Sequence, residues 1–201
     1  MKLLIVSASQ RPGSQSARVA GYLSEHANQF SEIQHIELCR YDLPFWDGDR
    51  NGAALKASDW QKISPLVKQA DALVLITPEW GGMASPMLKN FLLLCDNQDT
   101  AHKPALLVAV TSGISGAYPI AELKMNALKN NKLVPIPDHL IIRNVEQVLG
   151  EGEIDAREQG LRARIGYSLH MLGQYADALG AIRQRHRDQP YPKQQEYVYG
   201  M

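Results

Sequence analysis

Apolar runs separated by amphipathic segments dominate the first two thirds of the chain. The runs at residues 3–6, 72–76 and 104–110 are apolar throughout. Strands without a polar face are typical of parallel sheets that are covered on both sides. Residues 33–38 alternate apolar and polar side chains, which predicts a strand at the sheet edge, and residues 133–142 form a fifth strand that prolines interrupt.

Helical spacing fills the segments between these strands. It predicts helices over residues 16–28, 58–69, 87–95 and 120–128. In the first of them, Ala20, Leu23 and Ala27 fall on one face of the helix. Strands that alternate with helices predict an α/β fold, in which a doubly wound five-stranded parallel sheet lies between two layers of helices.

The last third of the chain has a different pattern. Apolar residues at helical spacing from Leu161 to Leu179 predict a long helix over residues 155–187, although glycines inside the segment weaken that prediction. Residues 188–201 are too polar to form a core, so we expect them to be either disordered or laid as an arm across a partner subunit. The chain is therefore predicted to be one domain, residues 1–187, followed by a tail.

Composition narrows the classes of function. With 201 residues, 45% of them hydrophobic and 21% charged, the chain matches an ordinary globular domain. The formal net charge of zero gives no support for binding to nucleic acid or to a membrane surface. No apolar run approaches the roughly 18 residues of a membrane helix, and the N-terminus lacks the pattern of a secretion signal, so we expect a cytoplasmic location. Cys39 and Cys95 lie in apolar settings and are expected to be structural.

The loop at residues 7–16 carries the first candidate chemistry. It joins a predicted strand to a predicted helix, and the free N–H groups and macrodipole of a helix start favour an anion. Three serines and Arg11 could donate hydrogen bonds to phosphate oxygens. Neither GxxxxGK[ST] nor GxGxxG is present, so a phosphate monoester is favoured over a triphosphate or a dinucleotide. The alternative is a plain strand-to-helix turn, with a serine N-cap and a Pro-Gly pair.

Two further loops are predicted to lie beside the first one. Residues 77–86 and 111–116 follow the third and fourth strands and are rich in glycine and small residues. In an open parallel sheet, ligands bind outside the carboxyl ends of the strands. A plain turn or helix cap explains each loop taken alone, but three such loops at one edge favour a binding cleft.

Motifs in these loops resemble those of the NADPH-dependent FMN reductase family of flavodoxin-like proteins, which includes quinone, azo-dye and chromate reductases. They read ASQR…SQS in the first loop, TPEWGG…LKN in the second and TSG…G in the third, and the resemblance covers about residues 1–145. It implies a flavodoxin-like three-layer α/β/α sandwich that binds FMN and uses NADPH. It implies that the FMN phosphate is held by Ser9, Arg11, Ser14, Gln15 and Ser16. The isoalloxazine ring would lie against Pro78, Glu79, Trp80, Gly81 and Gly82, with Ser112, Gly113 and Gly116 near its other side.

The chain departs from the family pattern at several positions. Ala8 stands where glycine is usual, Ser16 where asparagine is usual, and Met83 where serine is common; the proline near position 85 falls one residue later. Trp80 and Gly81 replace a tyrosine and an asparagine. Tryptophan keeps an aromatic face for stacking. Losing the asparagine and serine side chains leaves the ring contacts mainly to backbone N–H groups.

The resemblance implies an NAD(P)H-dependent oxidoreductase that transfers a hydride from NADPH through bound FMN to a flavin, a quinone or a similar acceptor. No pattern in the sequence nominates a general acid, a general base or a metal ligand.

A homodimer or homotetramer is expected, and in the family the flavin edge is often completed by a neighbouring subunit, for which residues 41–49 are the candidate contact. Two alternatives stay open: a flavin-binding electron carrier or regulatory protein without NAD(P)H turnover, and a protein that uses the phosphate loop for another ligand.

Overall fold

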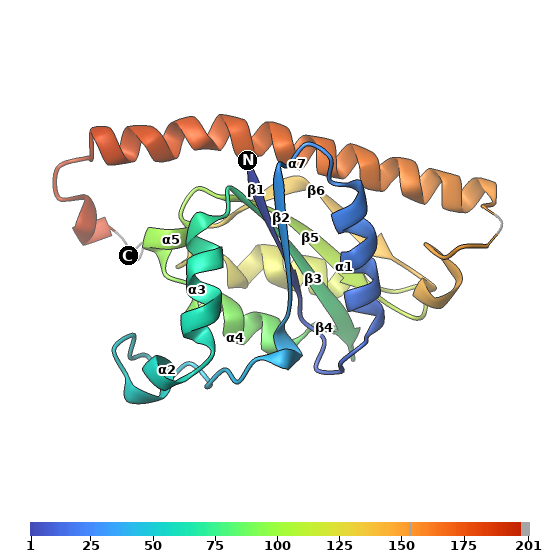
Figure 1. The fold of residues 1–201 in the computed structure, drawn as a ribbon, viewed down its shortest axis with the longest axis horizontal. Coiled ribbons are helices and arrows are strands. Elements are labelled where there is room, and N and C mark those ends of the chain that lie inside the picture. Colours follow the sequence, from blue (N-terminus) through green and yellow to red (C-terminus); the bar gives the residue numbers. More distant parts are fainter. Residues whose placement is uncertain (153, 198–201) are drawn as a thin grey trace.

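The computed structural model describes residues 1–152 and 154–197 and has a parallel sheet at its centre (Figure 1). Its parallel strands follow the order β2-β1-β3-β5-β6. They are β1 (Lys2–Ser7), β2 (Glu32–Glu37), β3 (Ala72–Trp80), β5 (Pro104–Val110) and β6 (Val134–Ile142). The prediction of a doubly wound five-stranded parallel sheet is confirmed, with the alternating strand β2 at one edge.

Helices cover both faces of this sheet, so the fold has the three layers predicted (Figure 1). The helices α1 (Gln15–His26) and α7 (Ala156–Asp188) lie on one face. The helices α3 (Trp60–Gln69), α4 (Pro86–Leu94) and α6 (Ala117–Glu122) lie on the other. The shorter elements are α2 (Ala53–Ala57), α5 (Asn97–Thr100), a π turn (Leu123–Ala127) and the 3₁₀ turns Leu38–Arg40, Val145–Gln147 and Gln194–Tyr197.

The alternation of side chains along each strand divides the core into two clusters. In β1, Leu3 and Ile5 pack under α1 and α7, whereas Leu4 and Val6 pack under α3 and α4. All four side chains are at most 1% exposed. This two-sided burial explains why β1, β3 and β5 are apolar throughout their buried parts.

The segment after residue 76 differs from the prediction of a loop. β3 continues to Trp80 and is followed by the short strand β4 (Met83–Ala84), which pairs antiparallel with its end. Gly81 and Gly82 have φ angles of 56° and 81°, and positive φ angles allow a two-residue turn between paired strands. The sheet thus gains a sixth, antiparallel strand at its carboxyl edge.

The long C-terminal helix is unbroken over 33 residues, so its glycines do not interrupt it. Asp155 caps it by accepting a hydrogen bond from the Glu158 N–H at 2.7 Å. Beyond the helix, Lys132 Nζ donates to Tyr197 O at 2.8 Å, so the described part of the tail lies against its own chain. Residues 198–201 of the predicted tail, Tyr199 among them, lie outside the described residues. The domain boundary at residue 187 stays a prediction.

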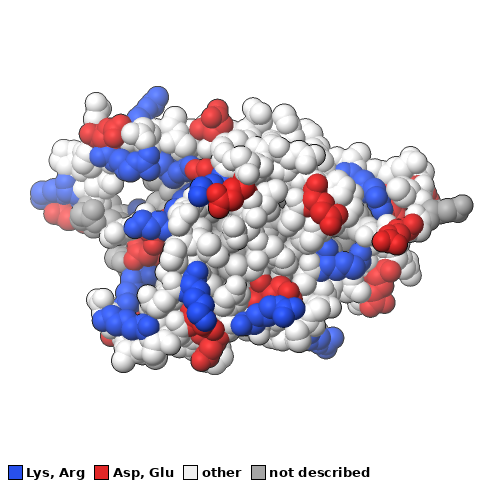
Figure 2. Space-filling model, viewed as in Figure 1, with Lys and Arg blue, Asp and Glu red and all other residues white. Residues whose placement is uncertain are grey.

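Charged side chains of both signs are spread over the face of the molecule that Figure 2 shows, in keeping with a formal net charge of zero. None of the helices in residues 1–152 and 154–197 combines the length and the apolar character needed to span a membrane.

Candidate active site at the carboxyl edge of the sheet

Three loops leave the carboxyl ends of β1, β3 and β5, and these strands are neighbours in the sheet. All the residues that the sequence assigned to a flavin site lie in these loops or in the strand and helix ends beside them. The structure therefore places the predicted phosphate residues next to the predicted ring residues. Whether each of them touches FMN stays a prediction.

The β1–α1 loop ends in a capped helix. Ser14 Oγ accepts a hydrogen bond from the Ala17 N–H at 3.2 Å, and Ser9 Oγ accepts one from the Arg11 N–H at 3.2 Å. A hydroxyl that accepts can still donate its own hydrogen. The N–H groups in the first turn of α1, at Gln15 and its neighbour, have no partner within the helix, and the helix macrodipole adds partial positive charge there. The loop therefore offers hydroxyl and backbone donors for an anion.

A residue outside the predicted set holds α1 in place. Arg18 Nε donates to Gln15 Oε1 at 2.7 Å, and its guanidinium donates to Leu149 O at 2.9 Å and to Val145 O. These bonds tie the start of α1 to the segment that follows β6. Gln15, which was assigned to the phosphate, is in the structure the acceptor for Arg18.

The hairpin formed by β3 and β4 supplies the second wall. A Cβ atom built on Gly81 or on Gly82 would meet no atom within 4 Å, so the turn backbone is open on that side. Ser85, just after β4, donates its N–H to Thr77 Oγ1 at 2.8 Å, which fixes the base of the hairpin. An open glycine backbone allows a flat ligand to approach the N–H groups of the turn closely.

Arg11 links the first loop to this hairpin. Its guanidinium carbon lies 4.6 Å from the ring centroid of Trp80, within the range of a cation–π contact. The Trp80 Nε1 donor is buried and has no hydrogen-bond partner among the described residues. A buried N–H group normally has an acceptor. The orphaned indole N–H at this edge therefore fits a site that receives a ligand with a hydrogen-bond acceptor.

The β5–α6 loop forms the third wall. Ser115 Oγ donates to Glu79 Oε1 at 2.7 Å, which joins this loop to the end of β3. Arg143 Nε donates to Ser115 O at 2.8 Å, and the Asn144 N–H donates to Gly113 O at 3.0 Å. Bonds from the end of β6 thus hold the loop that contains the predicted residues Ser112 and Gly113.

Gly116 closes this loop where α6 begins. Its φ angle is 103°, a conformation that L side chains rarely adopt. A Cβ atom built there would lie 2.4 Å from Ile141 Cγ2. The position therefore requires glycine for a structural reason, and its assignment to the flavin is untested.

Two residues of the LKN motif, Lys89 and Asn90, make contacts that hold segments beside the three loops in place. Lys89 Nζ lies 2.8 Å from Glu122 Oε1, and the Ala84 N–H donates to Glu122 Oε2 at 2.7 Å. Burial raises the pKa of Glu122, but the bonds from Lys89 and from the Ala84 N–H outweigh it and hold the pKa below its ordinary value. Asn90 accepts from the Trp46 N–H at 2.9 Å and donates to a carbonyl of the same loop, so it fixes the segment between β2 and α2.

Sequence reasoning missed Arg18, Glu122 and Ser115. Ser115 lies inside a predicted loop, next to a glycine, and that position was the available signal. Arg18 and Glu122 gave none, because the backbone groups that they hold are more than 30 residues away along the chain. Their partners become visible only in the folded sheet.

Other reactive side chains lie away from this edge or are inaccessible. Ser7 Oγ and His35 Nε2 are 2.9 Å apart, but Ser7 is only 2% exposed, so this pair offers no accessible nucleophile. Burial raises the pKa of the Cys39 and Cys95 thiols, which makes both poor nucleophiles. No group of three or more His, Cys, Asp or Glu residues suited to a metal ion occurs in the described part of the chain.

Comparisons with known proteins agree with this geometry. The family model for NADPH-dependent FMN reductases matches residues 1–147. An NADPH azoreductase of Bacillus sp. (strain OY1-2) is 31% identical over 157 residues, which is 78% of this chain and 85% of the relative. An FMN-dependent NADPH-azoreductase of Staphylococcus saprophyticus is 27% identical over 130 residues, covering 62% of this chain and 68% of the relative.

Solved structures show the same fold. An oxidoreductase from Corynebacterium diphtheriae has a TM-score of 0.69 at 16% identity, over 88% of this chain and 97% of the other. A flavoenzyme NAD(P)H:(acceptor) oxidoreductase from Paracoccus denitrificans has a TM-score of 0.66 at 18% identity, with the same coverage. The flavodoxin-like fold is therefore confirmed. The chain belongs to the NADPH-dependent FMN reductase family, and it is an oxidoreductase that uses NADPH and FMN.

Proposed function

We propose that the protein transfers a hydride from NADPH to an oxidised small molecule, a quinone, an azo compound or a free flavin, at the carboxyl edge of the sheet. One observation carries this proposal: the three loops are joined into one site. The contact of Arg11 with Trp80 and the hydrogen bond from Ser115 to Glu79 make the two connections. FMN, when bound, supplies the hydride-carrying chemistry. Azo compounds are included because the named relatives from Bacillus and Staphylococcus are azoreductases.

The three loops divide the binding tasks between them. Ser9, Arg11, Ser14, Gln15 and Ser16 would hold the phosphate, Pro78, Glu79, Trp80, Gly81 and Gly82 would lie along one part of the ring, and Ser112, Gly113 and Gly116 would lie along another. The buried Trp80 N–H and the open glycine turn support this assignment, because a flat heterocycle with carbonyl acceptors satisfies both. Positioning and exclusion of water carry the rate, since no general acid or base is nominated among the loop side chains.

Spectra of the purified protein test the proposal. We expect the protein to carry or take up FMN, seen as a yellow colour, and the flavin released on denaturation to be FMN rather than FAD. NADPH should bleach the colour, and an azo dye or quinone should restore it. A protein that takes up no flavin contradicts the assignment of the loops. A yellow protein that NADPH does not bleach is instead the electron carrier or regulatory protein of the alternative interpretation.

Initial-rate kinetics test the shared cleft. We expect the hairpin and the β5–α6 loop to admit one flat substrate at a time over the flavin ring, so NADPH would leave before the acceptor enters. Varying NADPH at several fixed acceptor concentrations should then give parallel double-reciprocal lines. Intersecting lines mean that both substrates bind together, and they contradict the single cleft.

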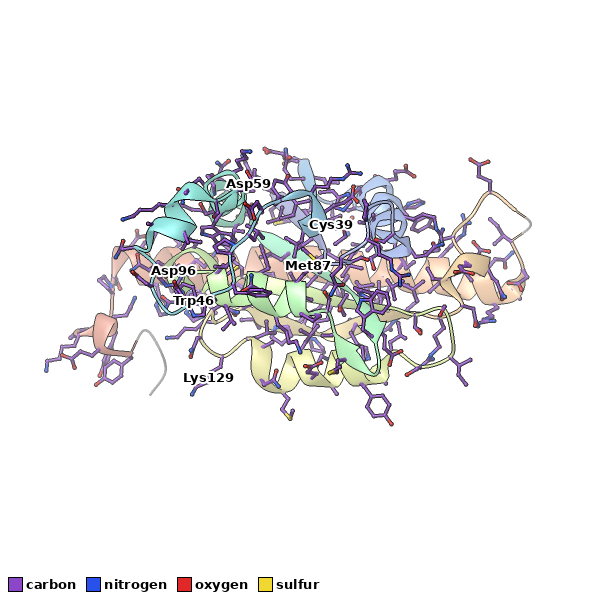
Figure 3. The ribbon with its side chains drawn as sticks, turned by 90° about the horizontal axis from the view of Figure 1, so that it is seen from below. Cys39, Trp46, Asp59, Met87, Asp96 and Lys129 are labelled. Atoms are coloured by element: carbon purple, nitrogen blue, oxygen red, sulfur yellow. The ribbon has the colours of Figure 1, made fainter. Side chains whose placement is uncertain are left out.

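We further propose that the protein is a homodimer whose interface lies on the face of α4. Phe45 is 85% exposed, Leu93 52% and Met125 79%, and exposed apolar side chains that lie near one another mark interaction surfaces. A cavity of about 740 Å³ is lined by Leu93 and by the chain neighbours of the other two residues, Trp46 and Asn126. It is bounded by the segment 46–51, α4 and residues 126–131. Figure 3 looks onto this face, with α4 in front and Trp46 labelled beside it. A neighbour seated here would contact residues 41–49, the segment predicted to meet a partner. A cytoplasmic location also stays a prediction.

A further inference from the structure

A second cavity lies at the amino-terminal edge of the sheet, opposite the three loops. It has a volume of about 680 Å³ and lies among the end of α3, α5, the C-terminal turn of α7 and the 3₁₀ turn Gln194–Tyr197. Figure 2 shows Lys and Arg side chains around a hollow at the left end of the molecule, where Figure 1 places these elements. A volume of this size is typical of sites for small ligands.

The lining of this cavity is strongly basic. Five of its residues are Lys or Arg and two are Asp, although the whole chain has no net charge. Arg183 pairs with Asp71 at 3.3 Å, and Lys68 approaches Asp99 at 4.0 Å. Lys132 and Arg187 also line the cavity, and neither is paired with a carboxylate among the residues that the structure describes. The local excess of positive charge favours an anion.

A buried amide in the wall points to a ligand with acceptor atoms. Asn97 lines the cavity and is only 4% exposed. Its Nδ2 group is buried and donates to no partner within the described chain. An unpaired buried donor costs free energy that an acceptor would recover. The amide and the surrounding cations therefore favour the same kind of ligand, one with negatively charged oxygens.

The pKa values of two residues that line the cavity are lowered, as expected in a basic site. Burial lowers the pKa of His102, and the nearby His186, Lys132 and Arg183 lower it further. Burial, followed by the charge of Arg183, lowers the pKa of Lys103 to about 8. Burial is the main cause for both groups and the positive charges nearby add to it, whereas Asp99 and Asp71 act on Lys103 in the opposite direction.

Two tyrosines give the site an aromatic side. Tyr191 and Tyr197 line the cavity and are 68% and 56% exposed, so their ring faces are accessible. Their ring centroids are 6.3 Å apart in an edge-to-face arrangement. Aromatic rings of this kind stack with nucleobases.

We propose that this cavity is a second binding site, for a nucleoside phosphate with at least two phosphate groups. The phosphates would contact Lys132, Arg187 and the amide of Asn97, and the base would lie against Tyr191 or Tyr197. The site is separate from the flavin loops, because it lies at the opposite ends of the same strands. The long helix α7 runs from the flavin side of the molecule to this cavity (Figure 1).

Calorimetric titration of the full chain with ADP tests the proposal. The protein is first saturated with FMN, so that the phosphate loop is filled, and NADPH is left out. Two exposed arginines in the last turn of α7 form a matched pair, because Arg187 lines the cavity and Arg185 does not. Arg187→Ala should weaken ADP binding about five- to tenfold, and Arg185→Ala should leave it within about twofold.

Asn97→Asp is the sharper variant. It keeps the shape of the side chain but replaces the donor by a negative charge, so it should weaken ADP binding by more than about tenfold. The buried carboxylate should lower the melting temperature. The FMN affinity, measured well below that temperature, should match that of the wild type, which separates loss of the site from loss of the fold. Pyrophosphate should bind more weakly than ADP, and adenosine more weakly still.

Three results would overturn the proposal. The first is a wild type that does not bind ADP. The second is equal binding of ADP to Arg187→Ala and to Arg185→Ala, which would place the ligand elsewhere. Pyrophosphate that binds as tightly as ADP would remove the base from the site.

Discussion

The Arg11 guanidinium connects the β1–α1 loop to the hairpin formed by β3 and β4, through its contact with Trp80. Arg11→Ala should weaken FMN binding by about 1.5–3 kcal/mol, the range for a hydrogen bond to a charged group. A fluorescence titration measures the change. The free energy of unfolding without flavin should change little, because Arg11 is exposed. Arg40→Ala removes an exposed arginine that belongs to none of the three loops and is the control. An equal loss of affinity in both variants would remove Arg11 from the site.

Lys103 gives the protein a pH dependence of stability. The buried side chain donates to Val67 O at 2.7 Å and to Lys68 O at 2.8 Å, and burial lowers its pKa to about 8. Between about pH 8 and 10.5 the unfolded chain keeps this proton and the native state has lost it. The native state therefore gains stability as the pH rises through this window.

The variant Lys103→Met isolates that effect. The free-energy difference between wild type and variant, from urea unfolding, should shift in favour of the wild type by about 1–3 kcal/mol from pH 7.5 to pH 10. A difference that is flat or falls with pH shows that the lysine keeps its proton in the folded state.

Single residues also show how far the sequence alone can lead. The serines of the first loop and the glycine pair at 81–82 were visible, because three hydroxyl-rich or glycine-rich loops follow apolar strands and meet at one edge of the sheet. The bond from Arg18 to Leu149 O was not visible, since it joins residues 131 positions apart. The basic cavity was hidden for the same reason, because Asn97, Lys132 and Arg187 come together only through the fold.

At the scale of elements, the β5–α6 connection depends on one glycine. Gly116→Ala would force an unfavourable φ angle and place a Cβ atom 2.4 Å from Ile141. We expect it to lower the free energy of unfolding by about 2–4 kcal/mol, measured in denaturant. Gly113→Ala is the matched control in the same loop, because its Cβ position is open, and it should stay within about 1 kcal/mol. Equal effects of the two substitutions would contradict this account.

Helices and strands could be predicted where buried apolar residues recur at a regular spacing along the sequence. The strands and α7 follow such repeats, and the contacts of Ile165, Leu169 and Leu172 with the core outweigh the helix-weakening effect of the glycines. β4 was missed because two residues are too short to show a period, and because Pro78 inside β3 suggested a loop. Tertiary pairing at the carboxyl edge makes this hairpin, and no local pattern specifies it.

At the scale of the whole molecule, the exposed apolar side chains of Phe45, Leu93 and Met125 predict the assembly. Leu93→Glu should convert the proposed dimer to a monomer, because it places a charge in a face that a neighbour would cover. Light scattering at micromolar concentration measures the mass. Ile182→Glu, at an exposed apolar position on α7, should leave the dimer intact. A monomeric wild type contradicts the interface altogether.

The position of α7 in the chain has a consequence for how the protein is made. Its residues Ile165, Leu169, Leu172 and Ala176 complete the core on one face of the sheet, yet they follow every strand in the sequence. A ribosome therefore releases the five strands before the helix that covers them. Until α7 emerges, Val74, Val108 and their neighbours face water, and the nascent chain is a substrate for chaperones and for aggregation. Slowing translation over the codons of α7 should prolong that vulnerable period, whereas slowing it earlier in the gene should not.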